Sequence, residues 1–206
     1  MQDFPLGAEG AGVVVAVGPG GAGSLTVGQA VAFNGASAFS EFVTLTRGSV
    51  VTPIPPGLGG AEAVALILSG VTACAALEVT AAIQPGEAVA VTAAAGGTGH
   101  LATQIAALQG CTVVALVGGP RKADAAEALG AQHVIDYSRQ DVQSSLRRLF
   151  PGGLDVVYEG VGGHLREALL DCLGPMGRLL QGVEGVADAV DYMLRGQHVG
   201  KVVIEL

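Results

Sequence analysis

Hydrophobic positions follow two different periods along the chain, and the change of period divides it into two parts. Up to about residue 54, short β-branched runs are separated by Gly, Pro, Asn and Ser. This pattern is typical of an all-β segment with tight turns, and it predicts strands over residues 12–17, 29–33, 39–45 and 50–54. Prolines and a glycine interrupt the pattern at residues 53–57, and an apolar, alanine-rich stretch then predicts a helix over residues 61–82.

Beyond Pro85-Gly86, predicted strands and helices alternate. After an apolar strand that begins at Val89, the strands are 111–117, 133–136, 154–159 and 178–180, and the helices are 100–108, 121–129, 141–150 and 164–172. This alternation indicates an α/β fold, a doubly wound parallel sheet with helices on both faces. After residue 180 we expect a loop, a short helix over 187–195 and a strand over 201–204, whereas a complete six-stranded sheet would need more chain here.

One glycine turn carries most of the functional information. Residues 89–99 read VAVTAAAGGTG, a buried strand that turns through glycines directly into a helix. Gly96 would let the backbone approach a pyrophosphate, and Gly99 would let the helix pack close to the strand. Ala94 stands where the GxGxxG pattern has its first glycine, so a plain tight turn is the alternative. The strand–helix–strand context favours a dinucleotide site.

The end of the following strand indicates which dinucleotide binds. NAD enzymes usually place an acid there, but this chain reads Leu116-Val117-Gly118-Gly119-Pro120-Arg121-Lys122. Two small residues followed by two cations favour the 2′-phosphate of NADPH. In the alternative interpretation, Arg121 and Lys122 are solvated residues of a helical first turn. Cations oppose the helix dipole at that end, which favours a functional reason for them.

Composition limits the class of protein. The chain has 206 residues, 50% of them hydrophobic, and a formal net charge of -8. Without a basic cluster, nucleic acid is not an expected partner. No membrane segment is predicted, because glycines and polar residues interrupt the uncharged stretch 88–120 and the stretch 63–77 is too short to span a bilayer. Three isolated cysteines and the lack of a signal peptide favour a reduced, intracellular protein.

Several motifs resemble those of the medium-chain dehydrogenase/reductase superfamily, in its zinc-independent quinone oxidoreductase and prostaglandin reductase branch. The matching segments are 5–12 (G-x-E-x-x-G), 27–31 (V-G-D-x-V), 69–73 (G-x-T-A), 93–99 (A-x-x-G-x-x-G) and 155–162 (D-V-V-x-x-x-V-G). Ala8 stands where zinc-dependent members carry a histidine, and the four histidines are expected in surface or packing roles. We therefore expect no metal.

The resemblance implies a Rossmann domain joined to an incomplete GroES-like β-domain. The expected divisions are 1–60 for the partial β-domain, 61–182 for the Rossmann domain, and 183–206 for a closing helix and strand that return to the β-domain. Compared with family members, segments before Met1 and after Leu180 are missing, including the last sheet strand. This implies either a truncated gene model or a truncated isoform.

The resemblance also implies a function: NADPH-dependent reduction of activated C=C bonds (2-alkenals, enones, 15-oxoprostaglandin-like compounds) or quinones, by hydride transfer without zinc. The alternative is a truncated, non-catalytic nucleotide-binding remnant. The implied cofactor residues are Thr72 and Val161 at the nicotinamide, Gly96, Gly97, Thr98 and Gly99 at the pyrophosphate, and Lys122 and Tyr137 at the 2′-phosphate.

No catalytic residue is assigned by the resemblance. Tyr158 and Tyr192 could donate a proton. However, Tyr158 falls in a predicted buried strand and Tyr192 in the closing helix, so we interpret both as packing residues. Full-length relatives often dimerise through the last sheet strand, so a homodimer stays open. A cytoplasmic location is expected, with the peroxisome or another organelle as alternatives, because the chain ends in Ile204-Glu205-Leu206 rather than S-K-L.

Overall fold

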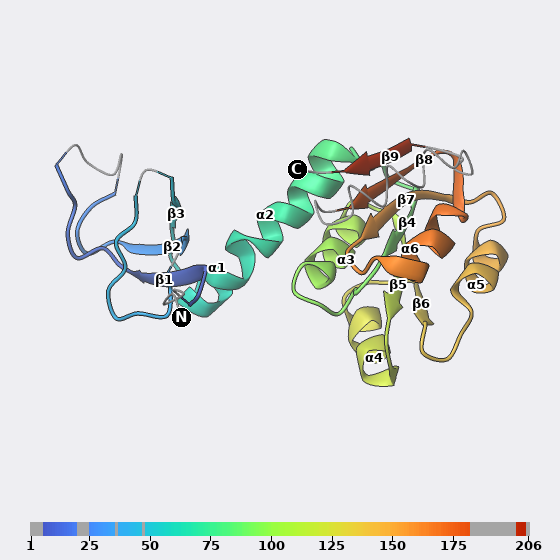
Figure 1. Ribbon diagram of the computed structural model, residues 1–206, viewed down its shortest axis with the longest axis horizontal. Coiled ribbons are helices and arrows are strands. Elements are labelled where there is room, and N and C mark those ends of the chain that lie inside the picture. Colours follow the sequence, from blue (N-terminus) through green and yellow to red (C-terminus); the bar gives the residue numbers. More distant parts are fainter. Residues whose placement is uncertain (1–5, 20–24, 36, 47, 182–200, 205–206) are drawn as a thin grey trace, which may run out of the picture. The chain divides into compact units, whose positions relative to one another are not determined.

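The computed structural model describes residues 6–19, 25–35, 37–46, 48–181 and 201–204 (Figure 1). The chain forms two compact units, Met1–Val71 and Thr72–Leu206. The chain passes from one to the other within a helical segment. The domain limits at residues 60 and 182 stay predictions.

The first unit contains a three-stranded antiparallel sheet. Its strands β1 (Glu9–Val13), β2 (Ala30–Asn34) and β3 (Val50–Pro53) lie in the order β1-β2-β3. The central strand β2 buries Val31, Ala32 and Phe33. Helix α1 (Gly60–Ile67) packs Ala63 and Ile67 against Ala32. The expected all-β segment is therefore present as an antiparallel sheet, beside a short helix.

Two strand predictions in this unit need correction. Strand β1 pairs with β2 from Glu9 to Val13, so it begins three residues before the predicted start at Gly12. No strand forms over residues 39–45, where Phe39 and Phe42 are 78% and 76% exposed. A short β-branched run alone cannot make a strand, because a strand also needs a neighbour with which to pair its backbone groups.

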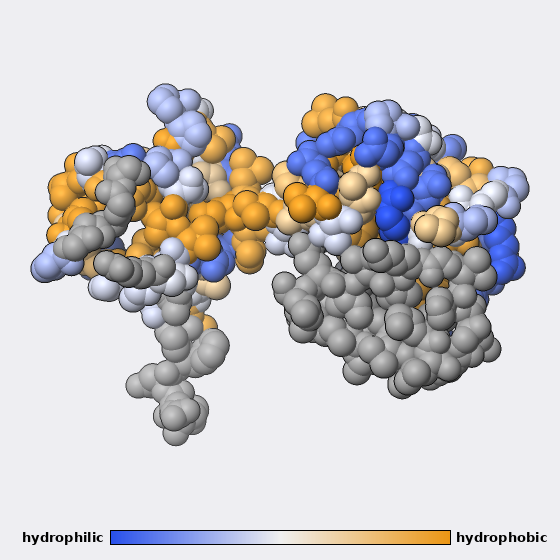
Figure 2. All heavy atoms as spheres, turned by 90° about the horizontal axis from the view of Figure 1, so that it is seen from above, coloured by the Kyte–Doolittle hydropathy of each residue, from blue (hydrophilic) through white to orange (hydrophobic). Residues whose placement is uncertain are grey.

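Apolar side chains gather on the surface of the first unit (Figure 2). Val13, Val15, Val17 and Phe42 are all exposed and line the same cleft, which has a volume of about 700 Å³. An exposed apolar surface of this kind is typical of an interaction site.

The predicted helix 61–82 forms as three consecutive helical segments: α1, α2 (Ser69–Cys74) and the π-helical η1 (Ala75–Thr80). Together they span 21 residues, and an 18-residue stretch within them has a mean hydropathy of 1.9, enough by length and composition alone to cross a membrane. The prediction that this stretch is too short is therefore wrong. Its second half buries Ala73, Ala76 and Leu77 in a protein core, and core helices have the same apolar composition.

The second unit is a six-stranded parallel sheet in the order β6-β5-β4-β7-β8-β9. The strands are β4 (Ala88–Val91), β5 (Thr112–Val117), β6 (His133–Asp136), β7 (Leu154–Glu159), β8 (Leu173–Gln181) and β9 (Lys201–Ile204). The helices are α3 (Gly99–Leu108), α4 (Pro120–Ala128), α5 (Val142–Leu149) and α6 (Gly163–Leu170). This is the doubly wound strand order of dinucleotide-binding folds, and it confirms the predicted fold class.

Both faces of the parallel sheet are buried. Alternate residues of β4 face opposite sides, so Val89 and Val91 belong to one core and Ala88 and Ala90 to the other. Helices α3 and α4 contribute to the first core, and α5 and α6 to the second. Burial on both faces explains why the predicted strands read as continuous apolar runs.

The end of the chain differs from the expectation. Strand β9 pairs in parallel with β8, from Lys201 beside Arg178 to Ile204 beside Gln181. The sheet therefore has a sixth strand, and the predictions that it ends at Leu180 and that residues 201–204 return to the β-domain are wrong. A strand can join a sheet in parallel only if it is far enough from its neighbour in the chain, and β8 and β9 are far enough apart in the sequence for this. The predicted helix 187–195 lies outside the described residues.

Candidate nucleotide-binding site

The candidate site lies at the carboxyl edge of the parallel sheet, where the strand order changes direction. From β4 the chain builds outward through β5 to β6 on one side, and from β7 through β8 to β9 on the other. In open α/β sheets, ligands bind outside the carboxyl ends of the strands at such a switch point. The loops after β4, β5, β6 and β7 are therefore the segments in which a binding site is expected.

The glycine turn after β4 is built around Ala93. Its φ is +45°, and its carbonyl oxygen accepts a hydrogen bond from Gly96 N at 2.7 Å. A Cβ on Gly99 would overlap that carbonyl group and lie 3.0 Å from the Cα of Ala94. Only glycine therefore allows α3 to begin so close to the turn. Gly96 is exposed, so its backbone is accessible to a ligand.

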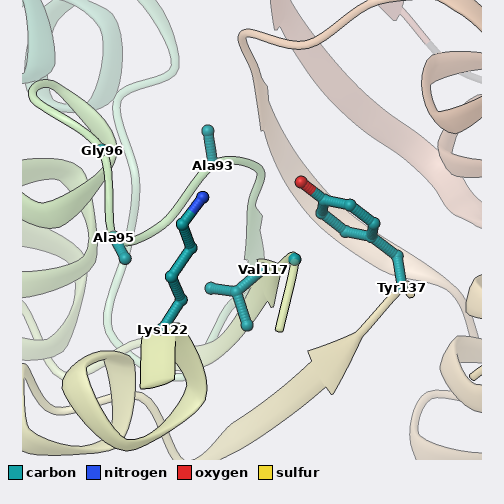
Figure 3. Close-up of a pocket in the computed structure, with 7 residues that line it drawn as sticks. Ala93, Ala95, Gly96, Val117, Lys122 and Tyr137 are labelled. Atoms are coloured by element: carbon teal, nitrogen blue, oxygen red, sulfur yellow. The ribbon is translucent and has the colours of Figure 1, made fainter. Parts of the chain in front are cut away.

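A small pocket of about 90 Å³ lies beside this turn (Figure 3). It is lined by Ala93, Ala95, Gly96, Val117, Gly118, Lys122 and Tyr137. In Figure 3, the Lys122 amino group and the Tyr137 hydroxyl both point toward the space between α4 and the end of β6. Whole-ligand pockets usually exceed about 300 Å³, so this cavity has the size of a single ligand group such as a phosphate.

The structure thus brings three of the predicted site residues together: Gly96, Lys122 and Tyr137. Gly97, Thr98 and Gly99 belong to the adjoining turn and the start of α3. Thr72 is half-buried in α2, and Val161 is 49% exposed after β7. Among the described residues, neither Thr72 nor Val161 lines the pocket. The cofactor contact of each predicted residue stays a prediction.

Asp136 is a residue of this edge that the sequence reasoning missed. It ends β6 and is only 8% exposed. Its Oδ1 accepts hydrogen bonds from Gly119 N at 2.9 Å, Ser138 N at 3.0 Å and Ser138 Oγ at 2.6 Å. The Ser138 hydroxyl first, and then the Gly119 N–H, lower the pKa of Asp136. The sequence signal that was missed is an acid at the end of β6, because an acid was looked for only at the end of β5.

Glu159 is a second buried acid that the sequence reasoning did not single out. It ends β7 and is 2% exposed. Its Oε1 accepts hydrogen bonds from Val161 N at 2.7 Å and Gly162 N at 2.9 Å. Thr92, which follows β4, accepts one from Gly160 N at 2.8 Å. These contacts hold the turn after β7 in shape beside the glycine turn.

The histidines do not gather into a metal site in the part of the chain that the structure describes, where no group of three or more potential ligands is found. His100 Nδ1 lies 2.9 Å from the carbonyl oxygen of Gly96. His133 stacks edge-on against Phe150, and His164 is fully exposed. These positions agree with the predicted surface and packing roles. His198 and Tyr192 lie outside the described residues, and Tyr158 packs against the core.

Comparison with known proteins identifies relatives of this chain. A family model for the zinc-binding dehydrogenases matches residues 97–189. Prostaglandin reductase-3 of Mus musculus is 37% identical over 177 residues, which are 86% of this chain and 46% of that protein. This similarity agrees with the resemblance to the prostaglandin reductase branch that the sequence motifs imply. The chain spans about half the length of this relative.

Solved structures share the whole described fold. A quinone oxidoreductase of Pseudomonas syringae superposes with a TM-score of 0.82 at 34% identity, covering 98% of this chain and 63% of that one. The Escherichia coli quinone oxidoreductase complexed with NADPH gives a TM-score of 0.80 at 28% identity, covering 97% of this chain and 62% of that one. The parallel sheet and the antiparallel sheet therefore both have counterparts in solved oxidoreductases.

Proposed function

We propose that the chain belongs to the zinc-binding dehydrogenase family of medium-chain dehydrogenases and reductases, and that it is an oxidoreductase that binds NADPH. The observation that carries this proposal is the meeting of Gly96, Lys122 and Tyr137 at one pocket on the switch-point edge. Three different segments supply these residues: the turn after β4, the first turn of α4 and the residue that follows β6. A folding requirement alone would not place an exposed glycine, a cation and a hydroxyl at the same cavity.

The residues present fit NADPH on two counts. First, Gly96 is exposed and leaves no side chain between a pyrophosphate and the backbone that precedes α3. Second, the Lys122 ammonium and the Tyr137 hydroxyl can both donate hydrogen bonds to a phosphate, and the pocket has the size of one. The ribose 2′-phosphate that distinguishes NADPH from NADH would occupy this cavity. The described end of β5 offers no acid in its place.

The proposed reaction is the reduction of an activated C=C bond (2-alkenal, enone or 15-oxoprostaglandin-like) or of a quinone. When bound, NADPH supplies a hydride to the β-carbon of the acceptor or to the quinone, and a proton completes the reduction. A conjugated acceptor is already electrophilic, so no metal is required. Glu159 and Thr92 shape the turn that carries Val161, and with Thr72 this turn would orient the nicotinamide ring.

Calorimetric titration with NADPH and NADH tests the cofactor. We expect NADPH to bind about tenfold more tightly, since a charge-assisted phosphate contact is worth about 1.4 kcal/mol. Lys122→Ala should remove most of this preference. Arg148→Ala is the matched control, because Arg148 is also an exposed helical cation but lies in α5, away from the pocket. Equal affinities for the two cofactors in the unmodified chain would refute the proposal.

A second candidate function is nucleotide binding without turnover. It is favoured by one observation: the pocket of about 90 Å³ has room for one phosphate of a nucleotide but not for an acceptor molecule beside it. Oxidation of NADPH at 340 nm in the presence of 2-hexenal or 1,4-benzoquinone separates the two. Turnover that is lost in Lys122→Ala at low NADPH and restored at high NADPH supports the reductase. Tight NADPH binding with no turnover on either acceptor supports the non-catalytic alternative.

A further inference from the structure

Asp136 lies between the two residues that the proposed 2′-phosphate pocket requires. In the sheet register, Asp136 at the end of β6 pairs with Val117 at the end of β5. Gly118 and Gly119 follow Val117 and lead into α4. Tyr137 follows Asp136 directly. The backbones on either side of the pocket therefore leave the sheet at the same level, with the Asp136 carboxylate between them.

One oxygen of Asp136 ties these two turns together. Oδ1 accepts a hydrogen bond from Gly119 N after β5, and two more from the backbone and hydroxyl of Ser138 after β6. Gly119 has a φ of +100° and is the N-cap residue of α4, and its carbonyl oxygen accepts a hydrogen bond from Lys122 N at 3.2 Å. The conformation of Gly119 therefore sets where α4 begins and where Lys122 emerges.

Contacts with the turn after β5 also fix the position of Tyr137. Tyr137 N donates to Val117 O at 3.0 Å, and a Cβ on Gly118 would lie only 3.0 Å from the Tyr137 ring and hydroxyl. The ring thus rests against the Gly118 backbone, which the Asp136 bond to Gly119 holds in place. Lys122 and Tyr137 are consequently fixed relative to each other through a single carboxylate.

The buried Asp136 carboxylate is unfavourable both for the stability of the fold and for the binding of an anion. The second oxygen, Oδ2, is buried and has no hydrogen-bond partner among the residues that the structure describes. A buried acceptor left without a partner destabilises a fold. In addition, a carboxylate near a phosphate pocket opposes the binding of an anion, so its charge by itself would not favour a phosphate. Any gain in phosphate affinity must therefore come from the positions that the Asp136 hydrogen bonds give to Lys122 and Tyr137.

We propose that Asp136 is a positioning residue that sets the preference of this site for a 2′-phosphorylated nucleotide, by holding the Lys122 and Tyr137 turns at the spacing of one phosphate. This inference rests on the proposed NADPH function. Asp136 itself does not contact the nucleotide. Its effect therefore falls on the 2′-phosphate half of the ligand and spares the remainder of the adenosine site.

The test uses two nucleotide fragments and the full chain. Adenosine 2′,5′-bisphosphate carries the 2′-phosphate, and 5′-AMP lacks it. Calorimetry measures the affinity of each for the unmodified chain and for Asp136→Asn, Asp136→Ala and Ser138→Ala. The matched control is Asp141→Ala. Asp141 is also an aspartate that accepts a backbone hydrogen bond from a nearby serine, Ser144 N at 2.8 Å. It is the N-cap residue of α5 and does not line the pocket.

We expect Asp136→Ala to weaken the bisphosphate about tenfold while 5′-AMP changes by less than about twofold. Asp136→Asn keeps an acceptor oxygen and should lose only about threefold. If Asp136→Ala does not fold, Ser138→Ala decides, because it removes only the hydroxyl donor and should lower the preference about threefold. Asp141→Ala should lower thermal stability and leave the ratio of the two affinities unchanged.

Each contrary result has a distinct meaning. If the unmodified chain shows no preference for the bisphosphate, the NADPH proposal fails and this inference fails with it. If the unmodified chain shows the preference and Asp136→Ala and Ser138→Ala both retain it, only the inference fails. A tighter bisphosphate complex in Asp136→Asn would mean that the carboxylate acts by repulsion. Equal losses in Asp136→Ala and Asp141→Ala would reduce the effect to general destabilisation. Both of these results would overturn the proposal.

Discussion

Replacing Gly99 by alanine is the sharpest test of how the glycine turn is built. The new Cβ would lie 2.8 Å from the carbonyl carbon of Ala93, closer still to its oxygen, and 3.0 Å from the Cα of Ala94. Ordinary van der Waals contact begins at 3.4 Å. All three atoms belong to the backbone, so no side-chain rotation can relieve the overlap. Helix α3 must move away from the turn or the turn must deform.

The loss of folding free energy that this movement causes can be estimated. Adding a methyl group to a well-packed site costs about 1–3 kcal/mol, and a clash with backbone belongs at the upper end. In a chain of this size, about 3 kcal/mol corresponds to a fall of about 6–12 °C in the melting temperature. Such a loss is a large part of the total stability of a typical domain, which is about 5–15 kcal/mol.

Urea and thermal unfolding followed by far-UV circular dichroism measure this effect. Gly152→Ala is the matched control, because a Cβ at Gly152 would meet nothing within 4 Å. The control should change the unfolding free energy by less than about 0.5 kcal/mol. If Gly99→Ala unfolds at the same midpoint as Gly152→Ala, then α3 adjusts freely, and the argument that glycine is required at this contact is refuted.

Three further predictions concern the same edge of the sheet. Gly96→Val should abolish NADPH binding in calorimetry while the far-UV spectrum is retained, because a branched side chain would stand on the exposed turn where the pyrophosphate is proposed; wild-type affinity would show that the turn is purely structural. Glu159→Ala should cost about 2 kcal/mol in urea unfolding, since two backbone N–H groups lose their acceptor, and Glu159→Gln should cost less; equal costs would contradict this. The pKa values of Asp136 and Asp141 are lowered by hydrogen bonds, so the unfolded chain binds more protons in acid. The stability that they contribute is complete above about pH 4 and is lost as the pH falls through the lowered pKa values; the double variant to asparagine should lose less stability between pH 5 and pH 3, and an unchanged loss would refute this attribution.

Local pattern was sufficient for the parallel sheet. Strands buried on both faces read as continuous apolar runs, and helices between them carry polar outer faces, so the order of elements after residue 86 followed from the sequence. The strands 133–136 and 154–159 have the limits that were predicted. The close packing of α3 against the turn could also be predicted, because only glycine tolerates the close approach of backbone that Gly99 makes.

The sequence was a poorer guide wherever a partner decides the outcome. Residues 39–45 have the composition of a strand, but none of the described strands pairs with them, and β9 pairs with β8 although the expected sheet ended there. Both errors come from the same source. A strand is defined by hydrogen bonds to a neighbour, which can lie far away in the chain.

The chain by itself therefore determined its α/β class, the glycine turn and the cations that follow β5, because each of these depends on residues within about one strand and one helix. The family resemblance implied a shared site for Lys122 and Tyr137, but only the tertiary structure decided that both line one small pocket and that the Asp136 and Glu159 carboxylates are buried and accept backbone hydrogen bonds. A carboxylate at the end of a strand reads the same whether it faces solvent or accepts three hydrogen bonds. Its role depends on which N–H groups the packing of the sheet brings within about 3 Å, and this distance is set by the fold as a whole.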